Sequence, residues 1–178
     1  EKTNRVLEYF DELFPDAYCE LNHESDFQLL VAVMLSAQTT DKKVNQLTEN
    51  LFKKYPTVEA VSQASLPELE QDIKTIGLYR NKAKNLLALS HVLIEQFDGI
   101  VPSDQKQLES LPGVGRKTAN VVRSVAFDIP AFAVDTHVER ISKRLGFAKR
   151  DDNVLTVEKK LCRSIPRNRW NKSHHQFI

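Results

Sequence analysis

The stretch that decides how this chain folds is Leu111-Pro112-Gly113-Val114-Gly115-Arg116-Lys117-Thr118. Two of the chain's five glycines fall within three positions here, between two segments of helical pattern. Pro112 fixes the entry to a turn, and the glycines permit positive φ and a close approach of the backbone to another molecule. The helix that follows directs free N–H groups and its positive dipole end into the turn, which favours a bound phosphate.

Three interpretations of this turn differ in what they require of the neighbouring residues. A Walker A loop fails because Arg116 separates Gly115 from Lys117, no glycine lies five positions before Gly115, and no strand precedes it. A dinucleotide-binding fingerprint fails for the same lack of a strand. A helix–hairpin–helix, which grips a nucleic-acid backbone without reading its sequence, remains. The alternative is a plain tight turn between packed helices.

The rest of the chain predicts helices joined by short loops. In the first helix, Val6, Leu7, Phe10, Leu13 and Phe14 share one face, and Pro15 ends it. No segment of strict alternation reaches strand length, so the predicted fold class is all-α. Helices are expected over residues 4–14, 26–37, 82–97 and 116–127, from 135 or 136 to 145, and from 152 or 153 to 163. Ser25 can cap the segment 26–37, for which a central strand is the alternative. One more helix starts at 40 or 41 and includes residue 52, and another starts at a capping box, Ser65–Glu68.

Composition excludes several classes of protein. The longest apolar run, Leu29–Leu35, has seven residues, whereas a membrane span needs about 18 or more. No secretory leader pattern opens the sequence. Cys19 and Cys162 lie 143 positions apart and outside any C-x-x-C pair, which excludes a disulfide scaffold and a zinc or iron–sulfur site built from this segment alone.

The formal net charge of +1 conceals an uneven distribution. Residues 1–40 carry eight acids and two bases, whereas residues 141–178 carry ten bases and three acids. A basic end of this density suits a polyanion. A solvated helical surface is the alternative interpretation, and charge alone does not decide between them.

Lys117 and Asp135 form a suggestive pair, eighteen residues apart. An Asp at a helix start is normally an N-cap. A lysine in the first turn of a helix is unusual, because its charge meets the positive dipole end, and this favours the neutral, nucleophilic amine. A nearby carboxylate can stabilise cationic intermediates or move protons. The spacing itself does not establish proximity.

Four stretches together resemble the endonuclease III family: Leu111–Val122, Val134–His137, Leu35–Asp41 and Ile76–Tyr79. The resemblance covers essentially the whole chain and implies a DNA glycosylase with lyase activity, acting on oxidised pyrimidines. Related adenine-mismatch glycosylases lack lysine at the position of Lys117, and related thymine-mismatch glycosylases typically have tyrosine there. Lys117 therefore points to the bifunctional branch.

The resemblance also implies an architecture of two helical lobes around a DNA-binding cleft. Residues 22–130 would form a six-helix barrel lobe containing the hairpin, and residues 1–21 plus 131–178 the second lobe. Lys117 would attack C1′ of a flipped nucleotide, leaving a Schiff base that undergoes β-elimination, while Asp135 would stabilise the positive charge on the sugar.

Further residues would contact DNA by the same resemblance. The amides of Gly113 and Gly115 would hold a phosphate, Gln38 would fill the gap left by the flipped base, and Leu78 would wedge the opposite strand. Gln38 as a helix-end polar residue and Leu78 as a packing residue are the alternatives, and His137 is expected to make a structural hydrogen bond near Asp135. The full set of expected DNA-binding positions is Gln38, Leu78, Gly113, Val114, Gly115, Arg116, Thr118 and His137.

Most members of the family carry a 4Fe–4S cluster on four cysteines that follow the stretch matching Trp170–Ile178. No residue here matches a ligand, so either the natural protein continues past Ile178 and carries the cluster there, or it is a cluster-free member of the family. We expect the former, with no cluster bound by this segment. The expected partner is duplex DNA with damaged pyrimidines or abasic sites, and no membrane association is expected. We expect a monomer, located in the cytoplasm with the nucleoid if the source is prokaryotic. A monofunctional mismatch glycosylase and a non-catalytic helix–hairpin–helix module remain as alternatives.

Overall fold

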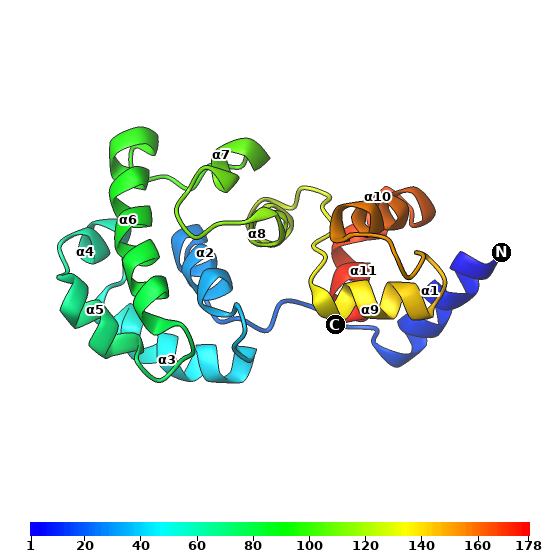
Figure 1. Ribbon diagram of the computed structural model, residues 1–178, viewed down its shortest axis with the longest axis horizontal. Helices are drawn as coiled ribbons and strands as arrows, with labels where there is room; N and C mark the ends of the chain where they lie inside the picture. The colour runs from blue at the N-terminus through cyan, green and yellow to red at the C-terminus, as the bar shows by residue number, and fades with distance from the viewer. The chain divides into compact units, whose positions relative to one another are not determined.

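The computed structural model describes all residues, 1–178, and contains helices but no strand (Figure 1). The all-α prediction is therefore confirmed. No helix combines the length and apolar character that crossing a membrane requires. The helices are α1 (Lys2–Leu13), α2 (Asp26–Leu35), α3 (Asp41–Lys54), α4 (Val58–Ser62), α5 (Leu66–Ile73), α6 (Tyr79–Phe97), α7 (Gln105–Glu109), α8 (Arg116–Phe127), α9 (Thr136–Arg144), α10 (Val154–Ser164), the 3₁₀ helix η1 (Arg167–Arg169) and α11 (Trp170–Phe177).

The chain divides into two compact units. Unit 1 comprises residues 1–19 and 123–178, and unit 2 comprises residues 20–122. Unit 2 thus holds α2 to α7 and the start of α8, whereas unit 1 holds α1, the end of α8, and α9 to α11. The division differs from the predicted lobes by two residues at the first boundary and eight at the second, because it falls within α8 rather than after it.

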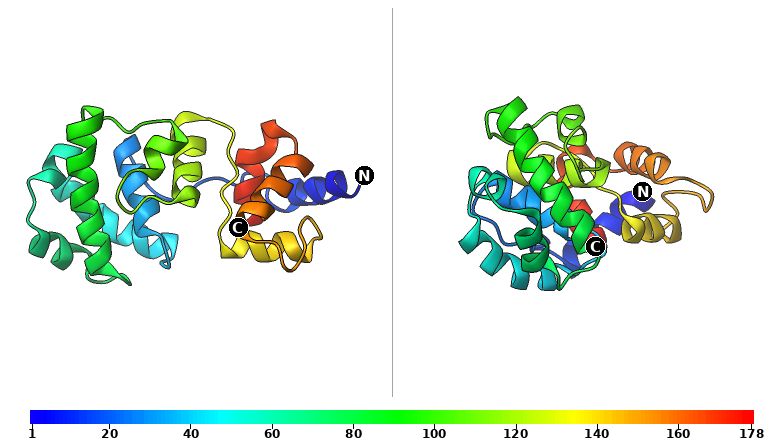
Figure 2. Two further views of the ribbon diagram at one scale, coloured as in Figure 1. Left: turned by 45° about the horizontal axis from the view of Figure 1, so that its top comes forward. Right: turned by 60° about the vertical axis from the view of Figure 1, so that its left-hand side comes forward.

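Unit 2 is organised around α2, whose residues from Phe27 to Leu35 are all buried. Ser25 caps this helix as predicted, its hydroxyl accepting a hydrogen bond from the Gln28 N–H at 3.2 Å. The helix ends at Leu35, two residues before the predicted end. Around it, α6 packs against α2, α4 and α5 (Figures 1 and 2), and the predicted Ser65–Glu68 capping box begins α5.

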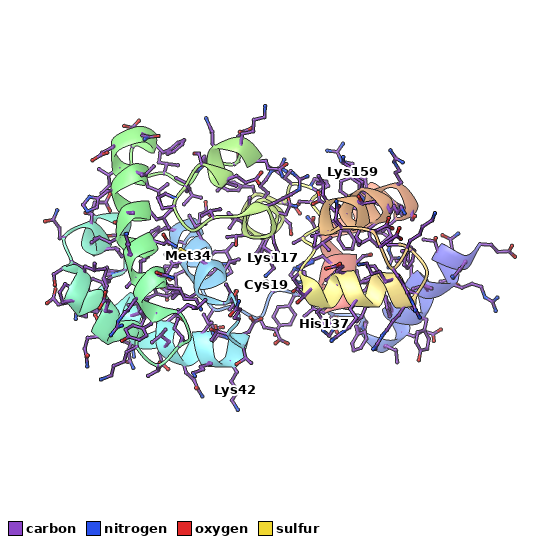
Figure 3. All side chains as sticks on the ribbon, in the orientation of Figure 1. Cys19, Met34, Lys42, Lys117, His137 and Lys159 are labelled. Atoms are coloured by element: carbon purple, nitrogen blue, oxygen red, sulfur yellow. The ribbon has the colours of Figure 1, made fainter.

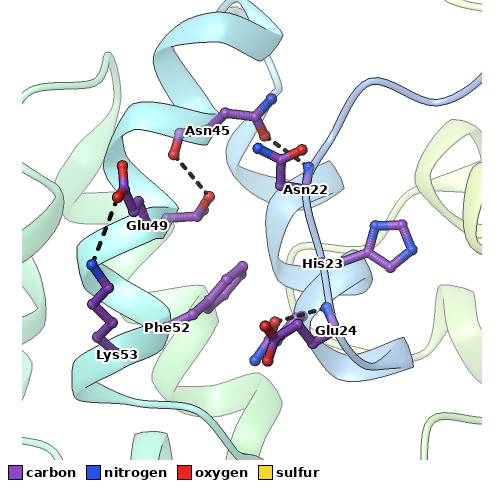
Figure 4. Close-up of a pocket in the computed structure, with 9 residues that line it drawn as sticks. Asn22, His23, Glu24, Asn45, Glu49, Phe52 and Lys53 are labelled. Carbon is purple, nitrogen blue, oxygen red and sulfur yellow. Dashed lines mark hydrogen bonds and ion pairs between the residues drawn. The ribbon is translucent and has the colours of Figure 1, made fainter.

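A polar pocket in unit 2 lies between α3 and the segment that precedes α2 (Figure 4). The Asn45 side chain accepts from the Asn22 N–H and donates to the Glu20 carbonyl, both at 2.8 Å. The Gln28 Oε1 likewise accepts from the Glu24 N–H at 2.9 Å. These amide groups therefore brace the chain as it enters α2.

Unit 1 has its own apolar core. Phe177 is central to it, with edge-on ring contacts to Phe10 at 5.1 Å and to Phe132 at 5.9 Å between centroids. The buried members are Leu7, Phe132, Val134, Val138, Val157, Leu161, Ile165 and Phe177.

The predicted apolar face of the first helix is only partly correct. Leu7 is buried and Phe10 packs against the core, but Leu13 and Phe14 are 49% and 48% exposed. The helix ends at Leu13, and Phe14 takes a non-helical conformation with φ −134° and ψ 62°. The helical face therefore does not continue through these two side chains.

Candidate functional site

The turn between α7 and α8 requires glycine at position 113. Gly113 has a φ of +77°, in the left-handed region that a side chain disfavours. A Cβ atom there would also lie 2.9 Å from both Asn85 Cβ and Met34 Sδ. The turn is therefore seated directly on α6 and α2, in the same unit, and Figure 3 labels Met34 on α2.

Gly115 has a different physical basis. Its φ is not positive, so only Gly113 of the two uses the freedom that glycine permits, and a Cβ atom at position 115 would meet nothing within 4 Å. The N–H groups of Gly113 and Gly115 make no hydrogen bond within the protein. The turn thus presents two unpaired amide donors on exposed residues, an arrangement suited to an external anion.

The other residues of the hairpin differ in exposure. Val114 is buried, with 6% of its surface exposed, and its N–H donates to the Leu111 carbonyl at 3.1 Å. Val114 therefore anchors the turn from inside the protein. Arg116 is exposed, and Thr118 is half-buried.

Lys117 occupies the first turn of α8 and is half-buried (Figure 3). It lies within electrostatic range of Asp41, the first residue of α3. Burial raises the pKa of the Asp41 carboxyl, and the Lys117 charge partly opposes that rise. Sequence analysis identified Asp41 only as a helix start. The available signal was an acid within the Leu35–Asp41 stretch, but nothing in the sequence places it beside Lys117.

Gln38 and Leu78 share an uncommon backbone conformation. Their φ angles are +57° and +60°, and both side chains are exposed, Leu78 by 55%. The left-handed region costs a non-glycine residue about 1–2 kcal/mol. The other non-glycine residues with positive φ, Asp98 and Asp128, directly follow helices α6 and α8 and are of a type that tolerates this conformation.

The exposure of Leu78 excludes its alternative role as a packing residue. An exposed apolar side chain on a strained backbone is a candidate for a contact with a ligand. Gln38 does follow the end of α2, but its φ places it outside the helix.

Asp135 is the N-cap of α9, as its sequence context predicted. Its Oδ1 accepts from the His137 N–H at 2.9 Å and the Val138 N–H at 2.8 Å. Its Oδ2 accepts no hydrogen bond from the protein. Capping and a chemical role are therefore compatible, because they use different oxygens.

His137 is held by two separate contacts. Its N–H bonds Asp135, while its ring Nδ1 accepts from Arg140 Nη2 at 3.1 Å. Both contacts lie within unit 1, whereas the hairpin, Gln38 and Leu78 belong to unit 2.

The residues present do not fit a metal cluster. No group of three or more His, Cys, Asp or Glu side chains is placed to hold a metal ion. The chain has two cysteines, Cys19 and Cys162, both half-buried, where a cluster with four thiolate ligands requires four.

Comparison with known proteins identifies the family. Residues 31–167 match the HhH-GPD superfamily of base excision DNA repair proteins. Endonuclease III of Bacillus subtilis (strain 168) is 56% identical over 172 residues, which cover 97% of this chain and 78% of that protein. The chain belongs to the endonuclease III family.

Other members and solved structures agree with this assignment. Endonuclease III of Escherichia coli (strain K12) is 44% identical over 99% of this chain and 83% of its own length. A structure of a trapped endonuclease III–DNA covalent intermediate superposes with a TM-score of 0.96 at 55% identity, covering 99% of this chain and 84% of that one. A thermostable thymine-DNA glycosylase, at 22% identity and a TM-score of 0.83, shares the fold. This endonuclease III family member is accordingly a DNA glycosylase of base excision repair, as the sequence motifs predicted.

Proposed function

We propose that this chain is a bifunctional DNA glycosylase and AP lyase that removes oxidised pyrimidines from duplex DNA and cleaves the strand 3′ to the abasic site. The observation that carries the proposal is the position of Lys117, in the first helical turn behind two unpaired amide donors. A module that only grips the DNA backbone needs no lysine there. The relative captured as a trapped covalent intermediate with DNA supports the same chemistry.

In the proposed reaction, the damaged nucleotide leaves the base stack so that its sugar C1′ becomes accessible. The neutral amine of Lys117 forms a bond to C1′, and the bond from C1′ to the base breaks with the electron pair leaving on the base. Loss of a proton from the nitrogen and opening of the sugar ring give a Schiff base. Removal of a C2′ proton then expels the 3′ phosphate, and hydrolysis of the Schiff base frees Lys117.

Two carboxylates support this chemistry in the proposal. Asp135 keeps Oδ2 available while Oδ1 caps α9, and that oxygen would stabilise the positive charge that develops on the sugar. Asp41, within electrostatic range of Lys117, would stabilise the cationic nitrogen of the intermediate.

The DNA contacts follow from exposure and strain. The amides of Gly113 and Gly115 would bind a phosphate next to the lesion, aided by Arg116 and Thr118 on the first turn of α8. Gln38 would occupy the gap left by the flipped base, and Leu78 would wedge the opposite strand. Val114 and His137 would act indirectly, by fixing the turn and the start of α9.

Borohydride trapping tests the lyase step. The chain is mixed with duplex DNA carrying one oxidised thymine or one abasic site, reduced, and separated on a denaturing gel. We expect a covalent band that disappears in Lys117→Ala, while duplex binding changes less than about threefold, because the phosphate contact uses backbone amides. Lys106→Ala, which removes an exposed lysine from the other helix of the hairpin, should retain the band.

The negative outcomes are informative. No band with either substrate from folded wild-type protein would contradict the lyase and leave a monofunctional glycosylase or a binding module. A band that survives Lys117→Ala would assign the nucleophile elsewhere.

Three further properties belong to the same proposal. The 4Fe–4S cluster would be held by residues other than those described here, so no step above depends on it; iron and sulfide analysis of the full-length protein tests this. The protein would act as a monomer, testable by light scattering with and without DNA. In a prokaryotic cell it would be found with the nucleoid in the cytoplasm, which a fluorescent fusion would show.

A further inference from the structure

Lys82 is a buried lysine that the proposed chemistry does not use. It lies in the first turn of α6, with 6% of its surface exposed. Its Nζ donates three hydrogen bonds, to the Leu35 carbonyl at 2.9 Å, the Ala37 carbonyl at 2.7 Å and the Thr39 Oγ1 at 3.1 Å. All three donors of the ammonium are thus satisfied by one short segment far away in sequence.

The environment suits a cation although no carboxylate pairs with it. Leu35 is the last residue of α2, so its carbonyl lies at the negative end of the helix dipole and has no partner within the helix. Burial lowers the pKa of Lys82 because the ammonium loses its hydration. The three acceptors offset this loss. A buried polar contact of this kind fixes geometry, since alternatives would leave its groups unsatisfied.

The two segments that Lys82 connects are those that carry Gln38 and Leu78. Gln38 lies between the acceptors Ala37 and Thr39, in the turn that leaves α2. Leu78 is the N-cap of α6, and its carbonyl accepts from the Lys82 N–H at 3.0 Å. The Lys82 side chain therefore bonds the Gln38 turn, while its N–H closes the first turn of α6 on Leu78 with the ordinary i→i−4 helical hydrogen bond. The side chain thus ties the Gln38 turn to the helix start that carries Leu78.

The hairpin turn meets the same ends of the same two helices. Gly113 packs against Met34, next to Leu35 at the end of α2, and against Asn85, one turn beyond Lys82 on α6. The turns containing Gln38, Leu78 and Gly113 thus converge where α2 ends and α6 begins.

We propose that Lys82 is a positioning residue that locks the Gln38 and Leu78 turns into one register, so that both side chains reach a duplex held by the hairpin. This inference rests on the proposed function, because it assigns the two side chains to DNA. Strained backbone persists only where the surrounding structure over-determines it, and the Lys82 side chain supplies that constraint at the Gln38 turn, which it fixes to the start of α6. The reacting atoms are not touched.

Lys82→Met tests the proposal by comparing two substrates. Duplex DNA with a central abasic site needs the gap filled and the strand wedged, whereas a single-stranded abasic oligonucleotide needs neither. We expect Lys82→Met to reduce kcat/KM on the duplex by roughly 10- to 100-fold, the effect of misplacing a positioning group by about 1 Å, and to change single-strand cleavage by less than about threefold. Lys84→Met, which removes an exposed lysine two residues along α6, is the matched control.

A second variant keeps the proposal testable if Lys82→Met unfolds. Thr39→Val removes one acceptor without leaving a charge unpaired, and it should reproduce the duplex-specific loss at about 2- to 5-fold, as one modest hydrogen bond implies. In a Gln38→Ala/Leu78→Ala background, either variant should add little further loss, because a positioning residue acts through the side chains it places.

The outcomes separate this inference from the proposed function. Wild-type protein that cleaves neither substrate contradicts the proposed function. Suppose instead that wild-type protein cleaves both substrates. The positioning role alone is then overturned if the Lys82 and Thr39 variants lose both activities equally. It is also overturned if these variants lose as much activity in the Gln38→Ala/Leu78→Ala background as in the wild-type background.

Discussion

At the scale of single residues, the two glycines of the hairpin separate a folding requirement from a binding requirement. Gly113 is fixed by its own φ of +77° and by Met34 and Asn85 at 2.9 Å from a would-be Cβ. Nothing inside the protein requires glycine at position 115, where a Cβ atom would meet no atom within 4 Å. The space at Gly115 is therefore available to a ligand that approaches the backbone closely.

We expect alanine at position 113 to reduce stability and alanine at position 115 to reduce DNA binding. Gly113→Ala should lower the free energy of unfolding by about 2–4 kcal/mol, from left-handed strain and overpacking. Gly115→Ala should leave the melting temperature unchanged within about 2 °C but weaken duplex binding by roughly tenfold, as a displaced phosphate contact implies. Thermal unfolding and fluorescence anisotropy measure the two effects. Unaltered DNA binding by Gly115→Ala would show that no ligand occupies that space.

At the scale of an element, the start of α9 depends on one carboxylate, that of Asp135, for two roles. It caps the helix, and in the proposed reaction it stabilises positive charge on the sugar. Asn caps a helix about as well as Asp but carries no charge, whereas Ala supplies neither the cap nor the charge. Asp135→Asn should therefore keep the melting temperature while slowing base release at least tenfold. Asp135→Ala should lose the same activity and also about 1 kcal/mol of stability. Single-turnover base release and thermal melts distinguish them. Equal base release by Asp135→Asn and wild type would reduce Asp135 to a cap.

The helices themselves show what a sequence predicts and where it stops. Ser25, Ser65 and Asp135 begin their helices as predicted, because a capping side chain bonds an N–H only two or three residues away. The left-handed turn at Gln38 is instead bonded by the side chain of Lys82, which lies 43 to 47 positions further along the chain. Such a contact leaves no local pattern. Motif resemblance indicated Gln38 and Leu78, but not their strain.

At the scale of the whole chain, part of the uneven charge is neutralised by ion pairs between basic and acidic side chains of the same chain. Of the ten bases in residues 141–178, Lys143 and Lys160 pair with Glu139 and Asp152. Arg169 and Lys172 both pair with Asp11, from the acidic front of the sequence. The basic count therefore overstates the charge available to a polyanion. Three arginines nevertheless line one surface groove of unit 1: Arg140, Arg144 and Arg150.

Asp11 joins the first and last helices of unit 1. Its carboxylate accepts two hydrogen bonds from Arg169 at 2.8 Å and one from Gln176 at 2.9 Å, and it lies 3.0 Å from Lys172 Nζ. Hydrogen bonding, chiefly from Arg169, holds the pKa of Asp11 far below its ordinary value of 3.8. A depressed pKa means that folding favours the charged form, so this stabilisation is complete above about pH 4 and is lost as the pH falls toward the folded pKa.

Asp11→Asn should therefore melt below wild type at pH 7, by no more than about 4 °C because exposed ion pairs are screened by solvent, and the difference should shrink steadily once the pH falls below about 4. Glu12→Gln, at an exposed neighbouring position on α1, should follow the wild-type melting curve at every pH. Melting temperatures of the three proteins between pH 7 and pH 2 measure the effect. If the gap between Asp11→Asn and wild type stays constant down to pH 2, the contribution of Asp11 is not electrostatic, and contacts such as the packing of Phe10 against Phe177 hold α1 to α11.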